Sequence, residues 1–191
     1  PLVTQLKPGD EVFGDMSRSH FGGFAEYACA SEKVFVRKPP GVSFMDAAAT
    51  PMAGVTALQA LRDYGRAQAG QRVLIAGASG GVGTFAIQLA KHLGLAVTAV
   101  CSTDKVALAR DLGADAVVDY KQEDFAQARD RYDLILALNG NRSIRDYRRV
   151  MAARGTYIAV GGEMPQIIQA LLLGPLLSAV SARRYCSVLA T

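Results

Sequence analysis

Three glycines spaced three residues apart, Gly77, Gly80 and Gly83, are the residues of this sequence whose type and spacing most clearly indicate a chemistry. In such a pattern the first glycine makes a tight turn and the second lets backbone approach a pyrophosphate. The third lets the following helix pack closely on the preceding strand. Because unpaired N–H groups at a helix N-terminus favour negative charge, the pattern predicts a phosphate-binding turn for a dinucleotide.

A strand and a helix must position these glycines. The apolar run over 72–76 predicts the strand, and apolar residues at helical spacing over 84–93 predict the helix. Further strands are expected over 96–101, 116–118, 132–138, 156–160 and 185–189, and further helices over 104–112, 123–128 and 144–152. Such alternation predicts parallel strands joined by right-handed crossovers, and therefore an α/β fold with a doubly wound parallel sheet.

The first forty residues have a different pattern. Short strands are expected over 11–14 and over the glycine-led segment 22–30, which together indicate an antiparallel β piece. Pro39-Pro40-Gly41 then separates a domain over 1–40 from a domain over 41–191. In the second domain Ser43 is expected to cap a helix, with Asp46 three residues later, and Thr50-Pro51 is expected to end or restart it before a second helix over 55–64.

Composition narrows the functional classes. Half of the 191 residues are hydrophobic, a fifth are charged and the net charge is +4, which suits an anionic cofactor but does not by itself indicate nucleic-acid binding. Three widely spaced cysteines favour a reducing compartment, and we expect a cytoplasmic protein. The apolar stretch 167–180 is interrupted by Gly174-Pro175 and is shorter than a bilayer-spanning helix of about 20 residues, so no membrane association is expected.

The tip of the second strand bears on the choice of cofactor. A carboxylate is usual there in NAD sites, where it accepts hydrogen bonds from the ribose, but this strand ends at Cys101. Asp104 follows as a residue of the first helical turn, whereas Ser102, Thr103 and Lys105 offer two hydroxyls and a positive charge for a 2′-phosphate. These residues favour NADPH, which we expect to bind at least about tenfold more tightly than NADH.

Several segments together resemble one family. They are 9–14 (Gly-Asp-Glu-Val-Phe-Gly), 23–27 (Gly-Phe-Ala-Glu-Tyr), 38–40, 47–51, 56–58, the turn 77–83, 112–115 (Leu-Gly-Ala-Asp) and 119–120 (Asp-Tyr). In this order they resemble the zinc-independent medium-chain dehydrogenases/reductases of the quinone oxidoreductase type. The resemblance implies a Rossmann domain over 41–191 without its C-terminal return segment, and over 1–40 a fragment of a GroES-like antiparallel β catalytic domain.

The resemblance also implies positions along NADPH. Thr56 would lie near the nicotinamide, and Ser102, Lys105 and Tyr120 near the 2′-phosphate. The pyrophosphate would contact the turn at Ser79, Gly80, Gly81 and Val82. The loops after the fourth and fifth strands would border the ribose and nicotinamide through Asn139, Gly140, Val160, Gly161 and Gly162.

The resemblance implies hydride transfer to a quinone, an enone or a related carbonyl compound, with a small-molecule substrate and a possible homodimer. Zinc members carry closely spaced cysteines before the Gly-Phe-Ala-Glu-Tyr segment, where this chain has residues 16–21, and 49–56 contains no Cys, His or acid. No metal ligand is therefore expected, and no catalytic residue is assigned. A non-catalytic dinucleotide-binding module or an inactive domain fragment is the alternative, and Cys101 at the strand tip disfavours a methyltransferase.

Overall fold

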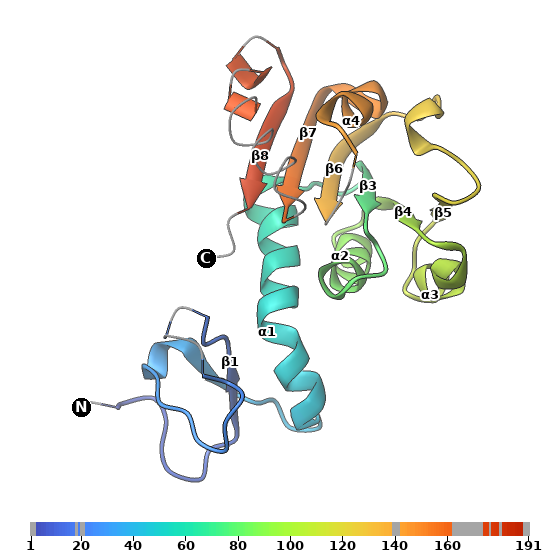
Figure 1. The fold of residues 1–191 in the computed structure, drawn as a ribbon. Helices are drawn as coiled ribbons and strands as arrows, with labels where there is room; N and C mark the ends of the chain where they lie inside the picture. Colours follow the sequence, from blue (N-terminus) through green and yellow to red (C-terminus); the bar gives the residue numbers. More distant parts are fainter. Residues whose placement is uncertain are drawn as a thin grey trace. The chain divides into compact units, whose positions relative to one another are not determined.

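A computed structural model describes residues 3–17, 19, 22–138, 142–161, 174–175, 177–179 and 181–188 (Figure 1). The chain divides into two compact units, one up to Val55 and one from Thr56 onward. The assignment of 1–40 to a partial GroES-like domain and of 41–191 to a Rossmann domain stays a prediction, and the division between the compact units lies further along the chain than residue 40.

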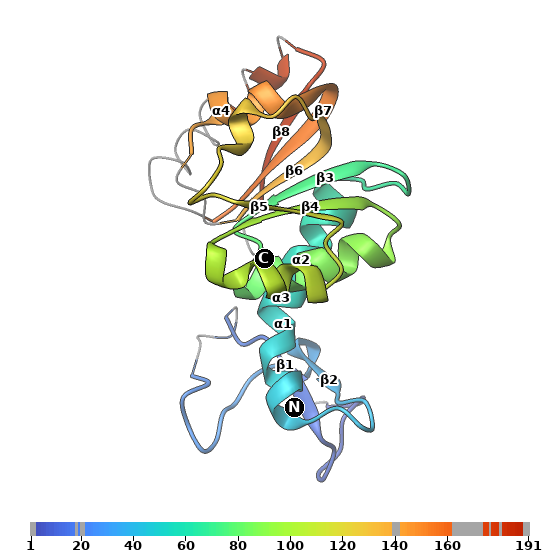
Figure 2. The ribbon, with the colours of Figure 1, turned by 90° about the vertical axis from the view of Figure 1, so that its right-hand side faces the viewer.

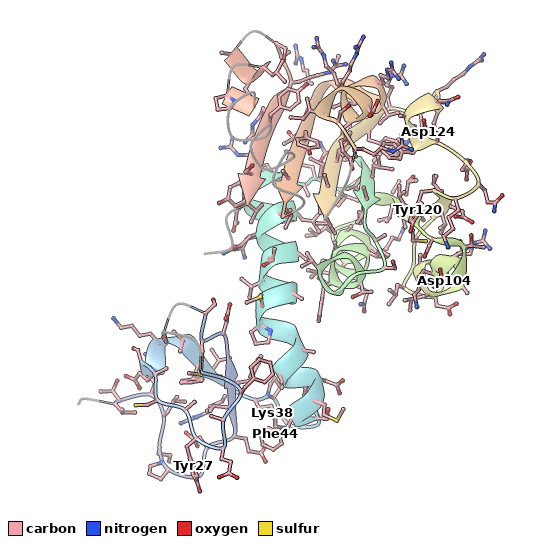
Figure 3. All side chains as sticks on the ribbon, viewed as in Figure 1. Tyr27, Lys38, Phe44, Asp104, Tyr120 and Asp124 are labelled. Carbon is pink, nitrogen blue, oxygen red and sulfur yellow. The ribbon has the colours of Figure 1, made fainter. Side chains whose placement is uncertain are left out.

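The first unit contains a small antiparallel pair of strands, β1 (Val12–Gly14) and β2 (Phe35–Arg37), with a 3-10 turn, η1 (Glu32–Val34), before β2. The predicted strand over 11–14 is confirmed. The prediction of a strand over 22–30 is wrong, because that segment consists of bends and extended residues without strand pairing. Lys38 follows β2 with a side chain 7% exposed, and its Nζ lies 3.0 Å from Glu11 Oε2 and 5.2 Å from the centre of the Phe44 ring (Figure 3).

Helix α1 (Phe44–Leu58) begins at the predicted cap. The Ser43 hydroxyl accepts a hydrogen bond from the Asp46 N–H at 3.1 Å and donates to the Asp46 carboxylate at 2.7 Å. Pro51 lies inside this helix, so the expected interruption at Thr50-Pro51 is wrong. Instead of a second helix over 55–64, the chain continues from Leu58 into a π-helical turn, η2 (Gln59–Tyr64).

The second unit is built around a six-stranded sheet with all its neighbouring strands parallel, in the order β5-β4-β3-β6-β7-β8. The strands are β3 (Arg72–Ala76), β4 (Ala96–Cys101), β5 (Ala116–Asp119), β6 (Tyr132–Leu138), β7 (Met151–Val160) and β8 (Arg184–Val188). This order is that of a doubly wound dinucleotide-binding sheet, with its topological switch between β3 and β6. The predicted fold class is confirmed.

Helices cover both faces of this sheet (Figure 2). They are α2 (Gly81–His92), α3 (Val106–Asp111) and α4 (Ile144–Val150), with 3-10 turns η3 (Thr103–Lys105) and η4 (Phe125–Gln127). One core packs α2, α3 and η2 against Val73 and Ile75 of β3. The opposite core packs α4 and η4 against Leu74 and Ala76, because successive side chains of a strand point to opposite faces.

Three predicted helices are shorter or of another type. The segment 104–112 divides into η3 and α3, the segment 123–128 forms only the 3-10 turn η4, and 144–152 gives the shorter helix α4 because β7 begins at Met151. Strand β7 begins at Met151 rather than at the predicted residue 156, and the other strands and helices lie within a few residues of their predicted bounds. In the part of the chain that the structure describes, no helix has the length and apolarity needed to cross a membrane.

Candidate cofactor-binding site

The turn between β3 and α2 shows which glycines the fold itself requires. Gly77 has a φ of +84°, and a Cβ there would overlap the Leu138 carbonyl oxygen of β6. A Cβ on Gly83 would overlap the backbone of Gly77 and Ala78. Because these obstacles are backbone atoms, both positions exclude side chains whatever binds nearby, and the predicted roles of Gly77 in the turn and of Gly83 in close packing are consistent with this geometry.

Gly80 is different. Its φ of −79° and ψ of 172° suit any residue, and a Cβ there would meet only the Gly77 carbonyl oxygen, at 3.6 Å, which is an ordinary contact. Gly80 is also the N-cap of α2, and it supplies no side chain to the N–H groups of the first turn. The fold does not require a glycine here, so its missing side chain leaves room for a ligand next to a helix N-terminus.

These residues line a cavity of about 460 Å³ at the carboxyl edge of the sheet. The walls come from the glycine turn, from the tips of β4, β6 and β7, and from the loop after β5. Nine predicted site residues meet in it: Gly77, Ser79, Gly80, Gly81, Val82, Gly83, Ser102, Tyr120 and Val160. Open parallel sheets bind ligands at this edge, at the switch in strand order.

The other predicted residues lie elsewhere. Thr56, in α1, is 7% exposed, and neither it nor Thr103, Lys105 or Gly161 lines the cavity. Gly161 follows β7 with a φ of +70°. Asn139, Gly140 and Gly162 lie outside the described residues. Their predicted contacts with the cofactor stay predictions.

The polar groups at the β4 tip form hydrogen bonds and an ion pair with carboxylates. The Ser102 hydroxyl donates to Asp104 Oδ1 at 2.6 Å, and the Thr103 hydroxyl donates to Asp119 Oδ2 at 2.6 Å. Lys105 Nζ lies 3.7 Å from Asp104 Oδ2. The hydrogen bond from Ser102 is the main cause that lowers the pKa of the Asp104 carboxyl, so Asp104 is ionised at neutral pH. The groups expected to hold a 2′-phosphate therefore have anionic neighbours.

Three cavity residues were missed by the sequence analysis. Val100, Cys101 and Leu138 lie at or next to the ends of β4 and β6 and contribute apolar walls. Burial raises the pKa of the Cys101 thiol, which keeps it protonated. The ends of the predicted strands could have indicated these residues, because the carboxyl ends of parallel strands meet at one edge of a sheet.

A second cavity, of about 640 Å³, lies beyond Tyr120, whose side chain borders both cavities. Its lining includes Asp124, Phe125 and Arg142. Arg142 lies 3.3 Å from the Asp124 carboxylate and above the Phe125 ring. Figure 3 labels Asp104, Tyr120 and Asp124 along this part of the second unit. Asp124 and Arg142 of this second cavity are thus paired with each other.

A further feature of the structure is the placement of its possible metal-ligating side chains. Within the described ranges, no group of three His, Cys, Asp or Glu side chains is placed to hold a metal ion. The donor set present there therefore does not fit a zinc site.

Comparison with known proteins places this geometry in a family. Residues 81–184, more than half of the chain, match the family model described as zinc-binding dehydrogenase. The chain belongs to the zinc-binding dehydrogenase family. Within it, the predicted resemblance to medium-chain dehydrogenases/reductases of the quinone oxidoreductase type is confirmed. A nicotinamide dinucleotide is the cofactor that this family implies, and the open position at Gly80 fits a pyrophosphate.

This chain is also similar to individual curated oxidoreductases. It is 42% identical over 141 residues to the 2-methylene-furan-3-one reductase of Solanum lycopersicum, covering 70% of this chain and 36% of that protein. It is 36% identical over 172 residues to the chloroplastic NADPH-dependent alkenal/one oxidoreductase of Arabidopsis thaliana, covering 83% and 44%. The chain thus spans less than half the length of these curated relatives, and the expected cytoplasmic location stays a prediction.

A solved structure matches along nearly the whole chain. The quinone oxidoreductase from Coxiella burnetii superposes with a TM-score of 0.79 at 29% identity, covering 99% of this chain and 58% of that one. This likeness includes the doubly wound sheet that carries the cavity.

Proposed function

We propose that this chain binds NADPH and belongs to an oxidoreductase that transfers a hydride to a quinone, an enone or a related carbonyl compound without zinc. The observation that carries the proposal is the cavity at the glycine turn. Gly80 lies in this cavity, directly before the N–H groups of α2. The fold would accommodate a side chain at this position, but glycine has none. Relatives named as reductases of alkenals and quinones support the substrate class.

The residues of the chain would hold the cofactor by position and charge. The first N–H groups of α2 would bind the pyrophosphate, and Ser102, Lys105 and Tyr120 would lie near the 2′-phosphate. Val100, Leu138 and Val160 supply apolar walls to part of the cavity. When bound, NADPH supplies a hydride from its nicotinamide to an electron-poor carbon, such as the β-carbon of an enone.

The absence of zinc from the proposed reaction has a chemical basis. An enone or a quinone is already electron-poor, so it needs less carbonyl polarisation than a simple ketone, and positioning supplies much of the rate. On an enone, a hydride added to the β-carbon would move the electron pair of the double bond toward oxygen, and solvent would deliver a proton to the α-carbon. No protein acid is needed for this balance, and none is assigned.

The test of this function has two parts. NADPH titration of the 191-residue chain tests binding, and NADPH oxidation with an enone or a quinone after treatment with a chelator tests the chemistry. We expect binding by the chain and metal-independent turnover by the full-length protein. Loss of all turnover on metal removal would contradict the zinc-independent reaction. Binding without turnover in the full-length protein would instead support the non-catalytic module.

We also propose that the protein forms a homodimer along β8. This strand pairs with β7 and is an edge of the sheet among the described residues, which leaves a row of backbone N–H and C=O groups for a second copy. Light scattering after size-exclusion chromatography should give twice the chain mass of 20.2 kDa. A monomeric mass at all concentrations would reject the dimer.

A further inference from the structure

The two hydroxyls at the β4 tip already donate their protons in hydrogen bonds to carboxylates. A serine or threonine hydroxyl has one proton to donate. Ser102 donates its proton to Asp104, and Thr103 donates its proton to Asp119, each at 2.6 Å. Phosphate oxygens at neutral pH need donors, so neither hydroxyl can donate to a 2′-phosphate while these bonds persist.

Asp104 affects more than one phosphate-binding group. Its Oδ1 accepts from Ser102, and its Oδ2 lies 3.7 Å from Lys105 Nζ, so one carboxylate is shared by both groups. Its negative charge also opposes the charge of a phosphate placed between them. Asp119 acts on Thr103, which does not line the cavity, whereas Ser102 does. Asp104 is therefore the carboxylate that a phosphate in the cavity would meet through Ser102.

The unphosphorylated ribose of NADH needs a hydrogen-bond acceptor, whereas a 2′-phosphate needs donors. A 2′-hydroxyl has its own proton and can donate it to a carboxylate, which is the usual acceptor in NAD sites. A ribose hydroxyl can thus bind beside Asp104 with the Ser102 bond intact. A 2′-phosphate has to displace Asp104 from Ser102 and has to share the Lys105 ammonium with it.

We propose that Asp104 is a specificity-determining residue that limits the preference for NADPH over NADH by competing with the 2′-phosphate for Ser102 and Lys105. This inference rests on the proposed function, since it assumes that the cavity binds a nicotinamide dinucleotide. In this inference Ser102 and Lys105 favour NADPH and Asp104 opposes it. The selectivity of the site for NADPH over NADH is then set by the balance between these opposing effects. Removal of the carboxylate should raise the selectivity for the phosphorylated ligand.

The experiment compares two probes that differ only in the 2′-phosphate, 2′,5′-ADP and 5′-AMP, by isothermal titration calorimetry at fixed ionic strength. Asp104→Asn removes the charge and keeps an acceptor for Ser102, whereas Asp104→Ala removes both. We expect D104N to raise the affinity ratio of 2′,5′-ADP to 5′-AMP by about fivefold, and D104A by at least as much. Asp111→Asn, which removes a charge from the far end of α3, is the matched control and should leave the ratio unchanged.

A second comparison tests the route through Ser102. In a Ser102→Ala background, D104A should change the ratio less than it does in the unaltered chain, because the hydroxyl that it releases is gone. Thermal melts establish that each variant is folded. An unchanged or lowered ratio in both Asp104 variants, with the unaltered chain binding both probes, overturns this inference alone. Failure of the unaltered chain to bind either probe overturns the proposed function and this inference with it.

Discussion

At the residue scale, the glycines of one turn have separable roles. Gly80→Ala should leave the free energy of unfolding within about 0.5 kcal/mol of the original, because the added Cβ meets only an ordinary contact. The same Cβ lies where the pyrophosphate must approach, so NADPH affinity should fall by at least about tenfold. Calorimetric titration measures the affinity and urea unfolding the stability. Unaltered affinity in G80A would place the cofactor elsewhere.

Gly77→Ala is the contrasting variant. It needs an alanine at a φ of +84° against the Leu138 carbonyl, so it should destabilise the protein by more than about 1 kcal/mol with or without cofactor. The midpoint of urea unfolding measures this effect. A midpoint equal to that of the unaltered chain would show that the turn adapts.

The sequence could predict the glycine turn because its signal is local. The hydrogen bond of the Thr103 hydroxyl could not be predicted in this way. Asp119 lies sixteen residues after Thr103 and meets it only because β4 and β5 pair in parallel, with Cys101 opposite Asp119. The bond from Thr103 to Asp119 therefore depends on that register rather than on either segment alone.

At the scale of elements, Asp115 joins α2 to two strands. It precedes β5, its carboxylate accepts from Lys91 of α2 at 2.7 Å, and it also accepts from the Val97 N–H of β4 at 2.7 Å. Lys91 is the main cause that lowers the pKa of Asp115. The folded state therefore prefers the ionised carboxylate. Its stabilisation is complete above the ordinary carboxyl pKa and is lost as the pH falls through the lowered value.

Asp115→Ala should lower the free energy of unfolding at pH 7 by about 1 kcal/mol, a value kept small because the side chain is half exposed. The difference from the unaltered chain should shrink as the pH falls below about 4. Urea unfolding at pH 7 and pH 3.5 measures both. A difference that does not depend on pH would mean that the carboxylate charge has no part in the effect.

A stack of aromatic rings anchors the short helix α4. Tyr147 is 1% exposed, with its ring centre 5.3 Å from that of Phe125 and 5.2 Å from that of Tyr157 in β7. Tyr147→Ala should cost about 3–5 kcal/mol by opening a cavity, whereas Tyr147→Phe keeps the ring and should cost less than about 1.5 kcal/mol. Thermal and urea unfolding compare the two. Equal costs would show that the hydroxyl, rather than the ring, stabilises this layer.

Some elements could be predicted and others could not, for physical reasons. The buried strands β3 and β6 are continuous apolar runs, which are clear signals. Pro51 suggested a helix end, but α1 continues through it. The segment 22–30 has strand-like residues, yet a strand also needs a pairing partner, and β1 pairs with β2 instead. Pairing is a property of the tertiary structure.

At the scale of the whole molecule, the chain is expected to prefer NADPH to NADH. In the proposed site Lys105 and Ser102 would favour the phosphorylated cofactor, and Asp104, which contacts both, would oppose it. The unaltered chain should still bind NADPH at least about tenfold more tightly than NADH. Parallel titrations with the two cofactors measure the ratio. Equal affinities would reject the assignment of NADPH.

We propose that the cavity at the carboxyl edge of the sheet binds NADPH through the turn between β3 and α2. Calorimetric titration of the 191-residue chain with NADPH, run in parallel with G80A, tests it most directly. We expect saturable binding at one site per chain, and an affinity at least about tenfold lower in a folded G80A variant. No binding by the unaltered chain, or equal binding by G80A, would contradict it.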